Sequence, residues 1–230
     1  MEPGDVICVV PARLDSKRLP RKVMACAGGK PMLIHSAQGG QMAGFRTIIA
    51  CDCQELADTA AEHGFESVIA ERHPNGTSRV FAAIRSLGIK PAVIVNIQAD
   101  DPDVSPGDIR SLAAKAYKSS AIQTLIGGEC SSTDLYNVDT VKAIVGYENR
   151  CHYFTRQPVP SAKLHIVEYA FPASVEVVMF TSPMADSERL EQLAWLECGH
   201  TIEATRATVE SHGINNEWDL RQWKLRHHNP

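Results

Sequence analysis

The sequence predicts an α/β fold, with a mainly parallel, Rossmann-like sheet in its first half and a smaller mixed lobe after it. Two observations support this prediction. Short apolar runs typical of buried strands alternate with amphipathic stretches of helical periodicity between Val6 and Ser119. The first run is continuously apolar, as strands are in parallel sheets that helices cover on both faces.

The elements of the first half follow one another regularly. The first strand is VICVV at residues 6–10, and a polar loop comes after it. Gly64 marks the end of one predicted helix, while Ser105 and Pro106 suit the N-cap and first turn of another. Further strands are predicted at 45–52, 65–71 and 91–98, and helices at 31–44, 54–64, 77–88 and 105–119.

The second half is less regular, and it contains no repeat or low-complexity linker. One domain over residues 1–230 is therefore the simplest organisation, with its halves dividing near residue 130. An apolar strand follows His165, and the tryptophans fall on helical segments with apolar neighbours. The other predicted elements are a strand pair over 140–156 around an Asn-containing turn, a strand at 175–180, a helix at 187–199 and a strand at 200–208.

The composition is that of a globular protein, with 44% hydrophobic and 22% charged residues. No apolar run approaches the roughly 20 residues of a membrane-spanning helix, and no basic region precedes the first apolar run. We therefore expect neither membrane insertion nor a signal peptide. A net charge of −4 gives no general attraction to nucleic acid, so any anion must be bound by a local basic cluster.

Seven cysteines are scattered through the predicted strands and helices. Their odd number argues against a disulfide framework and for a reducing compartment, so we expect a cytoplasmic protein. Cys51 and Cys53 are too close for the usual metal-binding pair, and no second pair has zinc spacing. Structural roles are the expectation for these thiols.

Basic side chains crowd the loop PARLDSKRLPRK after the first strand. Ligands of α/β sheets bind beyond the carboxyl ends of strands, where this loop lies. Its cations can neutralise a polyphosphate, although a solvated basic turn is an equal alternative. The loop lacks the glycine pattern of a Walker or dinucleotide motif, so side chains would hold the phosphates. The five cations are Arg13, Lys17, Arg18, Arg21 and Lys22.

Three aspartates, Asp100, Asp101 and Asp103, follow the buried run VIVNIQ. Carboxylates at the end of a strand suit Mg²⁺, which prefers oxygen ligands and often bridges protein and nucleotide phosphates. An acidic turn that merely ends the strand is the alternative.

Ten motifs span almost the whole chain. They are VPARLDSKRLPRK, GGKPMLIH, ACDCQELAD, HPNGTSRV, VNIQADDP, NVDTVKAIV, YFTRQPVP, LHIVEYAF, RLEQLAWLECG and GINNEWDL. In this order they resemble the 3-deoxy-manno-octulosonate cytidylyltransferases, within the CMP-acidic-sugar synthetases. One such motif would be weak support, whereas the ordered series is strong.

The resemblance implies a nucleotidyltransferase with a glycosyltransferase-A-like fold. It implies that the chain uses CTP and Mg²⁺ to transfer CMP to the anomeric hydroxyl of an acidic sugar and releases pyrophosphate, usually as a homodimer. The first half, to about residue 130, would bind the nucleotide. The second half would bind the sugar and form the dimer contact.

Site residues follow from the same resemblance. Arg13 and Lys22, with Mg²⁺ on Asp100, would offset charge on the transferring and leaving phosphates. Asn215 would be the second metal ligand, where the family has aspartate. The implied nucleotide-binding residues are Pro11, Ala12, Arg13, Arg18, Lys22, Gly76, Thr77, Ser78, Arg79 and Gln98.

Two of these positions depart from the family pattern. The amide of Asn215 can ligate a hard cation, but it lacks the charge of a carboxylate, so we expect weaker metal binding. Ser78 replaces an acidic residue between Thr77 and Arg79. These departures leave open a nucleotide-binding protein that has lost most of its catalysis.

The sugar side departs further. Pro172 and Ala194 stand where the family has arginines, and Glu168 enters a normally apolar strand. An acceptor such as an amino-octulosonate, a nonulosonate or a phosphonate therefore remains an alternative. The contacts that the resemblance implies have other interpretations. Arg156 would then be a solvated arginine, Glu191 and Gln192 surface residues of a helix, and His165 a structural residue. The implied sugar-binding residues are Gln98, Arg156, His165, Glu191 and Gln192.

Overall fold

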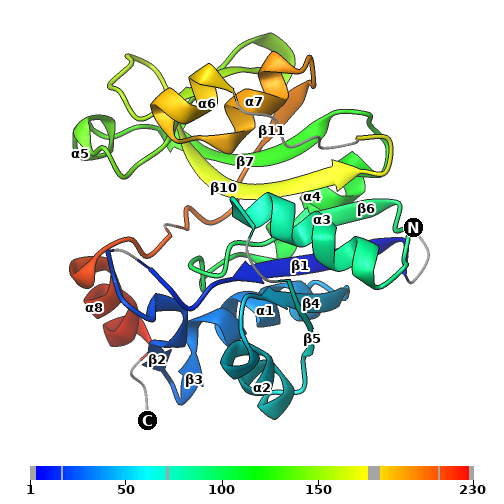
Figure 1. Ribbon diagram of the computed structural model, residues 1–230. Helices are drawn as coiled ribbons and strands as arrows, with labels where there is room; N and C mark the ends of the chain where they lie inside the picture. Colours follow the sequence, from blue (N-terminus) through cyan, green and yellow to red (C-terminus); the bar gives the residue numbers. More distant parts are fainter. Residues whose placement is uncertain (1–3, 17, 71–72, 176–181, 212, 228–230) are drawn as a thin grey trace.

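The computed structural model describes residues 4–16, 18–70, 73–175, 182–211 and 213–227. A nine-stranded sheet joins both halves of the chain (Figure 1). Its main path has the strand order β11-β7-β10-β6-β1-β4-β5, and β8 and β9 continue from β10. The predicted α/β fold with a mainly parallel sheet is confirmed.

The first half supplies four parallel strands with β1 at their centre. Side chains of β1 alternate between two apolar clusters on opposite faces of the sheet. Cys8 and Val10 pack in one cluster, whereas Ile7 and Val9 pack in the other. The strands are β1 (Val6–Ala12), β4 (Arg46–Cys51), β5 (Glu66–Ile69) and β6 (Val93–Asn96).

Helices cover both faces of this sheet, as the continuous apolar strand pattern requires. Three of them share the cluster of Cys8 and Val10, and α3 shares the cluster of Ile7 and Val9. Ser105 caps α4 as predicted, because its Oγ accepts a hydrogen bond from the backbone N–H of Asp108. The helices are α1 (Met32–Met42), α2 (Gln54–Glu62), α3 (Gly76–Ser86) and α4 (Pro106–Ala116).

In the second half, β10 (Lys163–Pro172) runs antiparallel between β6 and β7 (Ile122–Glu129). The predicted hairpin consists of β8 (Lys142–Val145) and β9 (Cys151–Thr155), joined by the short helix η2 (Tyr147–Asn149). The predicted late strand is β11 (Ile202–Arg206), parallel to β7. The sequence reasoning missed β7, which has the same apolar character as its neighbours and lies at the join of the two halves.

The helix predicted over 187–199 is confirmed over Glu191–Glu197, but its predicted start is wrong, because the chain breaks at Arg189. Arg189 has a left-handed backbone, with φ of 56°, and separates α6 (Pro183–Glu188) from α7 (Glu191–Glu197). The short helix α5 (Ser132–Tyr136) was not predicted. Of the strand predicted at 175–180, all but Val175 lies outside the described residues.

The C-terminal helix α8 (Glu217–Arg226) packs against the N-terminal part of the chain (Figure 1). Trp223 of α8 is fully buried in a cluster with Ala27 and Met32, whereas Trp218 is 68% exposed. This packing brings the segment before α8 to the loop after β1. The loop ends in helix η1 (Lys22–Met24) and strands β2 (Cys26–Ala27) and β3 (Lys30–Pro31).

All seven cysteines are free thiols. Across the part of the chain that the structure describes, no helix has the length and apolar character to cross a membrane.

Candidate active site

A cleft of about 300 Å³ opens where β1 and β6 end. Seven residues expected at a nucleotide or metal site line it, and six others, including His73 and Asn75, complete the wall. His73 and Asn75 belong to the motif HPNGTSRV, but the sequence analysis did not predict them as site residues. The expected lining residues are Pro11, Arg13, Lys22, Gly76, Arg79, Gln98 and Asp100.

An ion pair between Lys22 and Asp100 lies in the wall of this cleft. The Nζ atom of Lys22 is 2.5 Å from Oδ2 of Asp100 and 2.8 Å from the carbonyl oxygen of Ile214. Helix η1 supplies the lysine, and the turn after β6 supplies the aspartate. Arg13 is exposed in the same cleft and makes no hydrogen bond or ion pair with the described residues. Two cations therefore converge on one space.

Asn215 lies beside this ion pair. The N–H of Ile214 donates to the backbone carbonyl of Asp100 at 2.8 Å, which joins the segment before α8 to the turn after β6. Oδ1 of Asn215 accepts a 2.9 Å hydrogen bond from Arg18, and Arg18 also pairs with Asp139 of the second half. The two expected metal ligands, Asp100 and Asn215, therefore lie in the same region of the structure.

Only one of the three aspartates after β6 lines the cleft. Asp101 is 4% exposed and accepts a 2.6 Å hydrogen bond from Ser211, and burial raises the pKa of its carboxyl to about 7. Asp103 pairs with Arg226 and His227 at the end of α8. Asp100 is therefore the one of these three aspartates that faces the cleft.

These oxygens fit Mg²⁺ as a site with one carboxylate. Oδ1 of Asp100 accepts no hydrogen bond from the described residues, and Asn215 adds an amide oxygen nearby. Among residues that the structure describes, no three His, Cys, Asp or Glu side chains gather as metal ligands. Mg²⁺ commonly binds through one or two carboxylates together with substrate phosphates. The donor set thus suits a metal that arrives with a nucleotide.

The start of α3 forms another wall. Gly76 approaches Pro11 so closely that a Cβ atom on Gly76 would lie 3.3 Å from the proline Cγ. Ser78 does not line the cleft, because it forms a reciprocal cap with Asn75 at the helix start. The hydroxyl that replaces an acidic residue therefore has a structural partner.

Three other expected nucleotide residues also lie away from the cleft lining. Ala12 is buried in the core, and Thr77 is buried with its hydroxyl on Glu191. Arg18 lies at Asn215 and Asp139. Arg79 lines the cleft, and its Nε donates to the carbonyl of Ala70 at 3.2 Å.

Arg156 lies at the end of the β8–β9 hairpin. Its guanidinium donates to the backbone carbonyls of Val138 and Asp139, at 3.0 and 3.2 Å. Since the Asp139 side chain pairs with Arg18, these contacts connect Arg156 to the basic loop after β1. The residue does not line the cleft itself.

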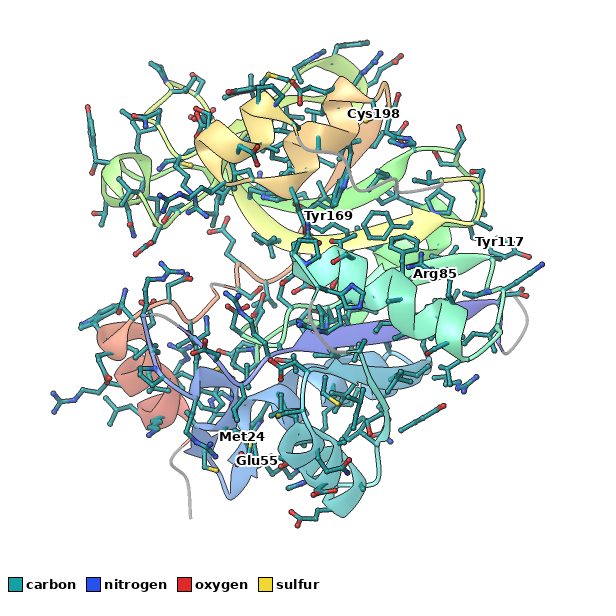
Figure 2. All side chains as sticks on the ribbon, in the orientation of Figure 1. Met24, Glu55, Arg85, Tyr117, Tyr169 and Cys198 are labelled. Atoms are coloured by element: carbon teal, nitrogen blue, oxygen red, sulfur yellow. The ribbon has the colours of Figure 1, made fainter. Side chains whose placement is uncertain are left out.

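Of the remaining sugar-side residues, His165 and Gln192 are buried and Glu191 is half-buried. Oε1 of Glu191 accepts a 2.6 Å hydrogen bond from Thr77, and burial raises the pKa of this carboxyl to about 7. His165 contacts Thr124 at 3.0 Å through Nε2, and burial lowers its pKa to about 3. Tyr169 of β10 (Figure 2) packs edge-on against Trp195 of α7, with ring centroids 4.8 Å apart.

Several buried polar atoms in this region have no hydrogen-bond partner among the described residues. Native structures leave few such atoms, so each needs an explanation, such as a ligand or a bound water. They are Oδ1 of Asn96, Nδ1 of His165, the hydroxyl of Tyr169, Oε2 of Glu191 and Nε2 of Gln192.

Residues 7–202 match the model of a family described as cytidylyltransferase. The chain belongs to the cytidylyltransferase family. This cytidylyltransferase is 31% identical, over 230 residues, to the 3-deoxy-manno-octulosonate cytidylyltransferase of a Nitratiruptor species, covering 93% of this chain and 96% of the relative. It is 37% identical over 236 residues to the protein of the same name from Azorhizobium caulinodans, covering 95% and 94%.

Solved structures agree with this cytidylyltransferase in fold. A CMP:2-keto-3-deoxy-manno-octonic acid synthetase in complex with CTP superposes with a TM-score of 0.88 at 24% identity, over 96% of this chain and 97% of that chain. HddC from Yersinia pseudotuberculosis, complexed with GMP-PN, gives 0.71 at 12% identity over 96% and 98%.

Proposed function

We propose that this cytidylyltransferase transfers CMP from CTP to the anomeric hydroxyl of 3-deoxy-manno-octulosonate or a close acidic sugar, with release of pyrophosphate. The observation that carries the proposal is the cleft at the ends of β1 and β6, where Arg13, Lys22 and Asp100 converge. Two relatives that match over more than nine-tenths of the chain bear the name of this activity.

The chain's own residues act on the phosphates by position and charge. The acceptor hydroxyl attacks the α-phosphorus of CTP, and the bond to the pyrophosphate leaving group breaks. Arg13 and Lys22 supply fixed positive charge that stabilises the negative charge on the transferred phosphate and on the leaving pyrophosphate. Such a reaction needs aligned reactants and no covalent intermediate on the protein.

The nucleoside would lie along the start of α3. Gly76 leaves room beside Pro11, and Arg79 and Gln98 present polar groups to the same cleft. We propose that Thr77 and Ser78 support nucleotide binding by holding the start of α3 in place. Arg18 would contribute to nucleotide binding from the mouth of the cleft. Mg²⁺ held by Asp100 and Asn215 would neutralise phosphate charge and lower the pKa of the acceptor hydroxyl.

The acidic sugar would bind on the side of the second half. The unpartnered polar atoms of His165, Glu191 and Gln192 offer donors and acceptors to its hydroxyls. Arg156 would face its carboxylate after exchanging the carbonyls of Val138 and Asp139 for the ligand.

One observation favours a second candidate acceptor. The arginines that the family pattern would place at Pro172 and Ala194 are absent from this chain, and the guanidinium of Arg156 is already hydrogen-bonded. A different acidic acceptor, such as an amino-octulosonate, a nonulosonate or a phosphonate, would need a different set of cations.

Pyrophosphate release with CTP, Mg²⁺ and a panel of these acceptors tests the proposal. We expect release with 3-deoxy-manno-octulosonate and formation of its CMP conjugate by mass spectrometry. The same assay with ATP, GTP and UTP checks the choice of nucleotide. Binding of CTP without pyrophosphate from any acceptor would reject the enzymatic proposal and support a homologue that has lost catalysis.

The single domain over residues 1–230, the homodimer and the cytoplasmic location stay predictions. Sedimentation velocity at several protein concentrations measures the oligomeric state. Limited proteolysis tests the domain: one domain should give no stable fragment that ends near residue 130.

A further inference from the structure

Glu168 is a carboxylic acid in the middle of the sheet, within the otherwise hydrophobic run IVEYAF of β10. It is fully buried, and burial raises the pKa of its carboxyl well above the ordinary value. Because burying a polar group costs free energy unless it makes hydrogen bonds, the partner of this carboxyl identifies its role.

That partner is the backbone N–H of Gln98, which lies 3.2 and 3.0 Å from the two carboxyl oxygens of Glu168. The N–H of Ile97 donates to Val9 on β1, so strand alternation turns the N–H of Gln98 toward β10. The ladder between β6 and β10, however, ends at Asn96 and Tyr169. The Glu168 side chain thus supplies the acceptor that the β10 backbone would supply in a longer ladder.

An irregularity in β10 makes this possible. Ile166 pairs with Leu125 of β7, but Tyr169 pairs with the adjacent Thr124, so Glu168 lies in a bulge. Bulges redirect side chains. The hydroxyl of Thr124 donates to the backbone carbonyl of Glu168 at 2.8 Å and fixes this bulge.

The turn that Glu168 holds carries Gln98 and Asp100, which both line the cleft. On its other side the turn is held by Ser36 of α1, whose hydroxyl donates to the carbonyl of Ala99 at 3.2 Å. Glu168 therefore joins this turn to β10, a strand of the second half of the chain.

We propose that Glu168 is a positioning residue, which fixes the Gln98–Asp100 turn through its hydrogen bond to the N–H of Gln98. The inference rests on the proposed function for its kinetic consequence. Its structural part, the attachment of the turn to β10, stands on the geometry alone.

Two substitutions separate positioning from packing. Glu168→Gln keeps the size and an acceptor oxygen, whereas Glu168→Leu keeps similar volume and removes the acceptor. We expect the leucine variant to lose about 10- to 100-fold in kcat/KM, as for other groups that orient site residues, and the glutamine variant to stay within about threefold of the wild type. The leucine variant should unfold at a somewhat lower temperature than the glutamine variant, because it leaves the N–H of Gln98 without its acceptor.

The structural part has its own measurements. Amide hydrogen exchange at Gln98 should accelerate by about tenfold or more in the leucine variant and stay unchanged in the glutamine variant. The affinity for CTP in metal-free buffer should fall in the leucine variant alone. Glu203→Leu is the matched control, because Glu203 lies on β11 with Gln123 and away from the cleft. It should leave both values unchanged.

Each outcome is informative. The inference would be overturned if the leucine variant kept the wild-type amide exchange at Gln98, CTP affinity and kcat/KM. It would also be overturned if the glutamine variant lost as much CTP affinity and kcat/KM as the leucine variant. If the leucine variant does not fold, Glu168→Met takes its place, because methionine adapts to irregular space. Wild-type protein that releases no pyrophosphate would reject the proposed function, while exchange at Gln98 would still decide the role of Glu168.

Discussion

Lys22 and Asp100 are 78 residues apart in sequence, and their side chains form an ion pair of 2.5 Å in the wall of the cleft. The lysine side chain is 10% exposed and the aspartate side chain 31% exposed. The same ammonium group donates to the carbonyl of Ile214, which precedes α8. One cation thus joins three distant segments at the point where phosphates and a metal would meet.

Removing this cation should slow the reaction. We expect Lys22→Met to lower kcat by about 10²- to 10³-fold, because the negative charge that develops on the phosphates would lose one preorganised cation. Steady-state kinetics with saturating CTP and Mg²⁺ measure the effect. Lys30→Met is the control, since Lys30 contacts Gln38 outside the cleft. Equal kcat values for the two variants would exclude Lys22 from the reaction.

Asn215→Asp should strengthen metal binding. The added carboxylate lies beside Asp100 and, at about 4 Å from a divalent cation, should lower the half-saturating Mg²⁺ concentration by about tenfold. Arg18 already contacts this side chain at 2.9 Å and will compensate part of the new charge. Initial rates over a Mg²⁺ titration measure the change.

Asn216→Asp is the matched control for that experiment. It adds the same charge one residue later, and aspartate preserves the N-cap that Asn216 provides to α8. An unchanged Mg²⁺ dependence in Asn215→Asp would mean that position 215 does not contribute to the metal site.

Gly76→Ala should narrow the nucleotide side of the cleft. Its Cβ would lie 3.3 Å from Cγ of Pro11, closer than ordinary contact, so one of the two walls must shift. We expect the KM for CTP to rise about tenfold. Gly107→Ala is the control, because a Cβ in the first turn of α4 meets only Ser105 at 3.5 Å. Equal KM values would place CTP elsewhere.

Glu191 should make stability depend on pH. Its pKa rises from 4.5 to about 7 on folding, so between these values the folded state holds a proton that the unfolded state releases. This contribution to stability is complete below pH 4.5 and is lost as pH rises through 7, by about 3 kcal/mol. Glu191→Gln should remove that loss.

Urea unfolding of wild type and variant from pH 4.5 to 8 measures the difference. Glu62→Gln makes the same chemical change on the exposed surface of α2 and serves as the control. Parallel pH curves for wild type and Glu191→Gln would show that the carboxyl of Glu191 titrates alike in the folded and unfolded states.

The sequence by itself determined the class of the fold and the family. Apolar runs and helical periodicity act over a few residues, so they located β1, β4, β5 and β6 and the helices between them. The ordered motifs identified a cytidylyltransferase. Local patterns could not place β10 between β6 and β7, because strand pairing joins residues far apart in sequence, and no neighbouring residue specifies the partner.

Only the tertiary structure decided which of the motif residues face the cleft. Packing of α8 on the N-terminal segment places Asn215 near Asp100. Arg226 of the same helix forms an ion pair with Asp103, which therefore does not line the cleft. Burial against Ser211 removed Asp101 from the cleft. These outcomes depend on which surfaces pack together and which carboxylates find partners, and both are properties of the folded chain.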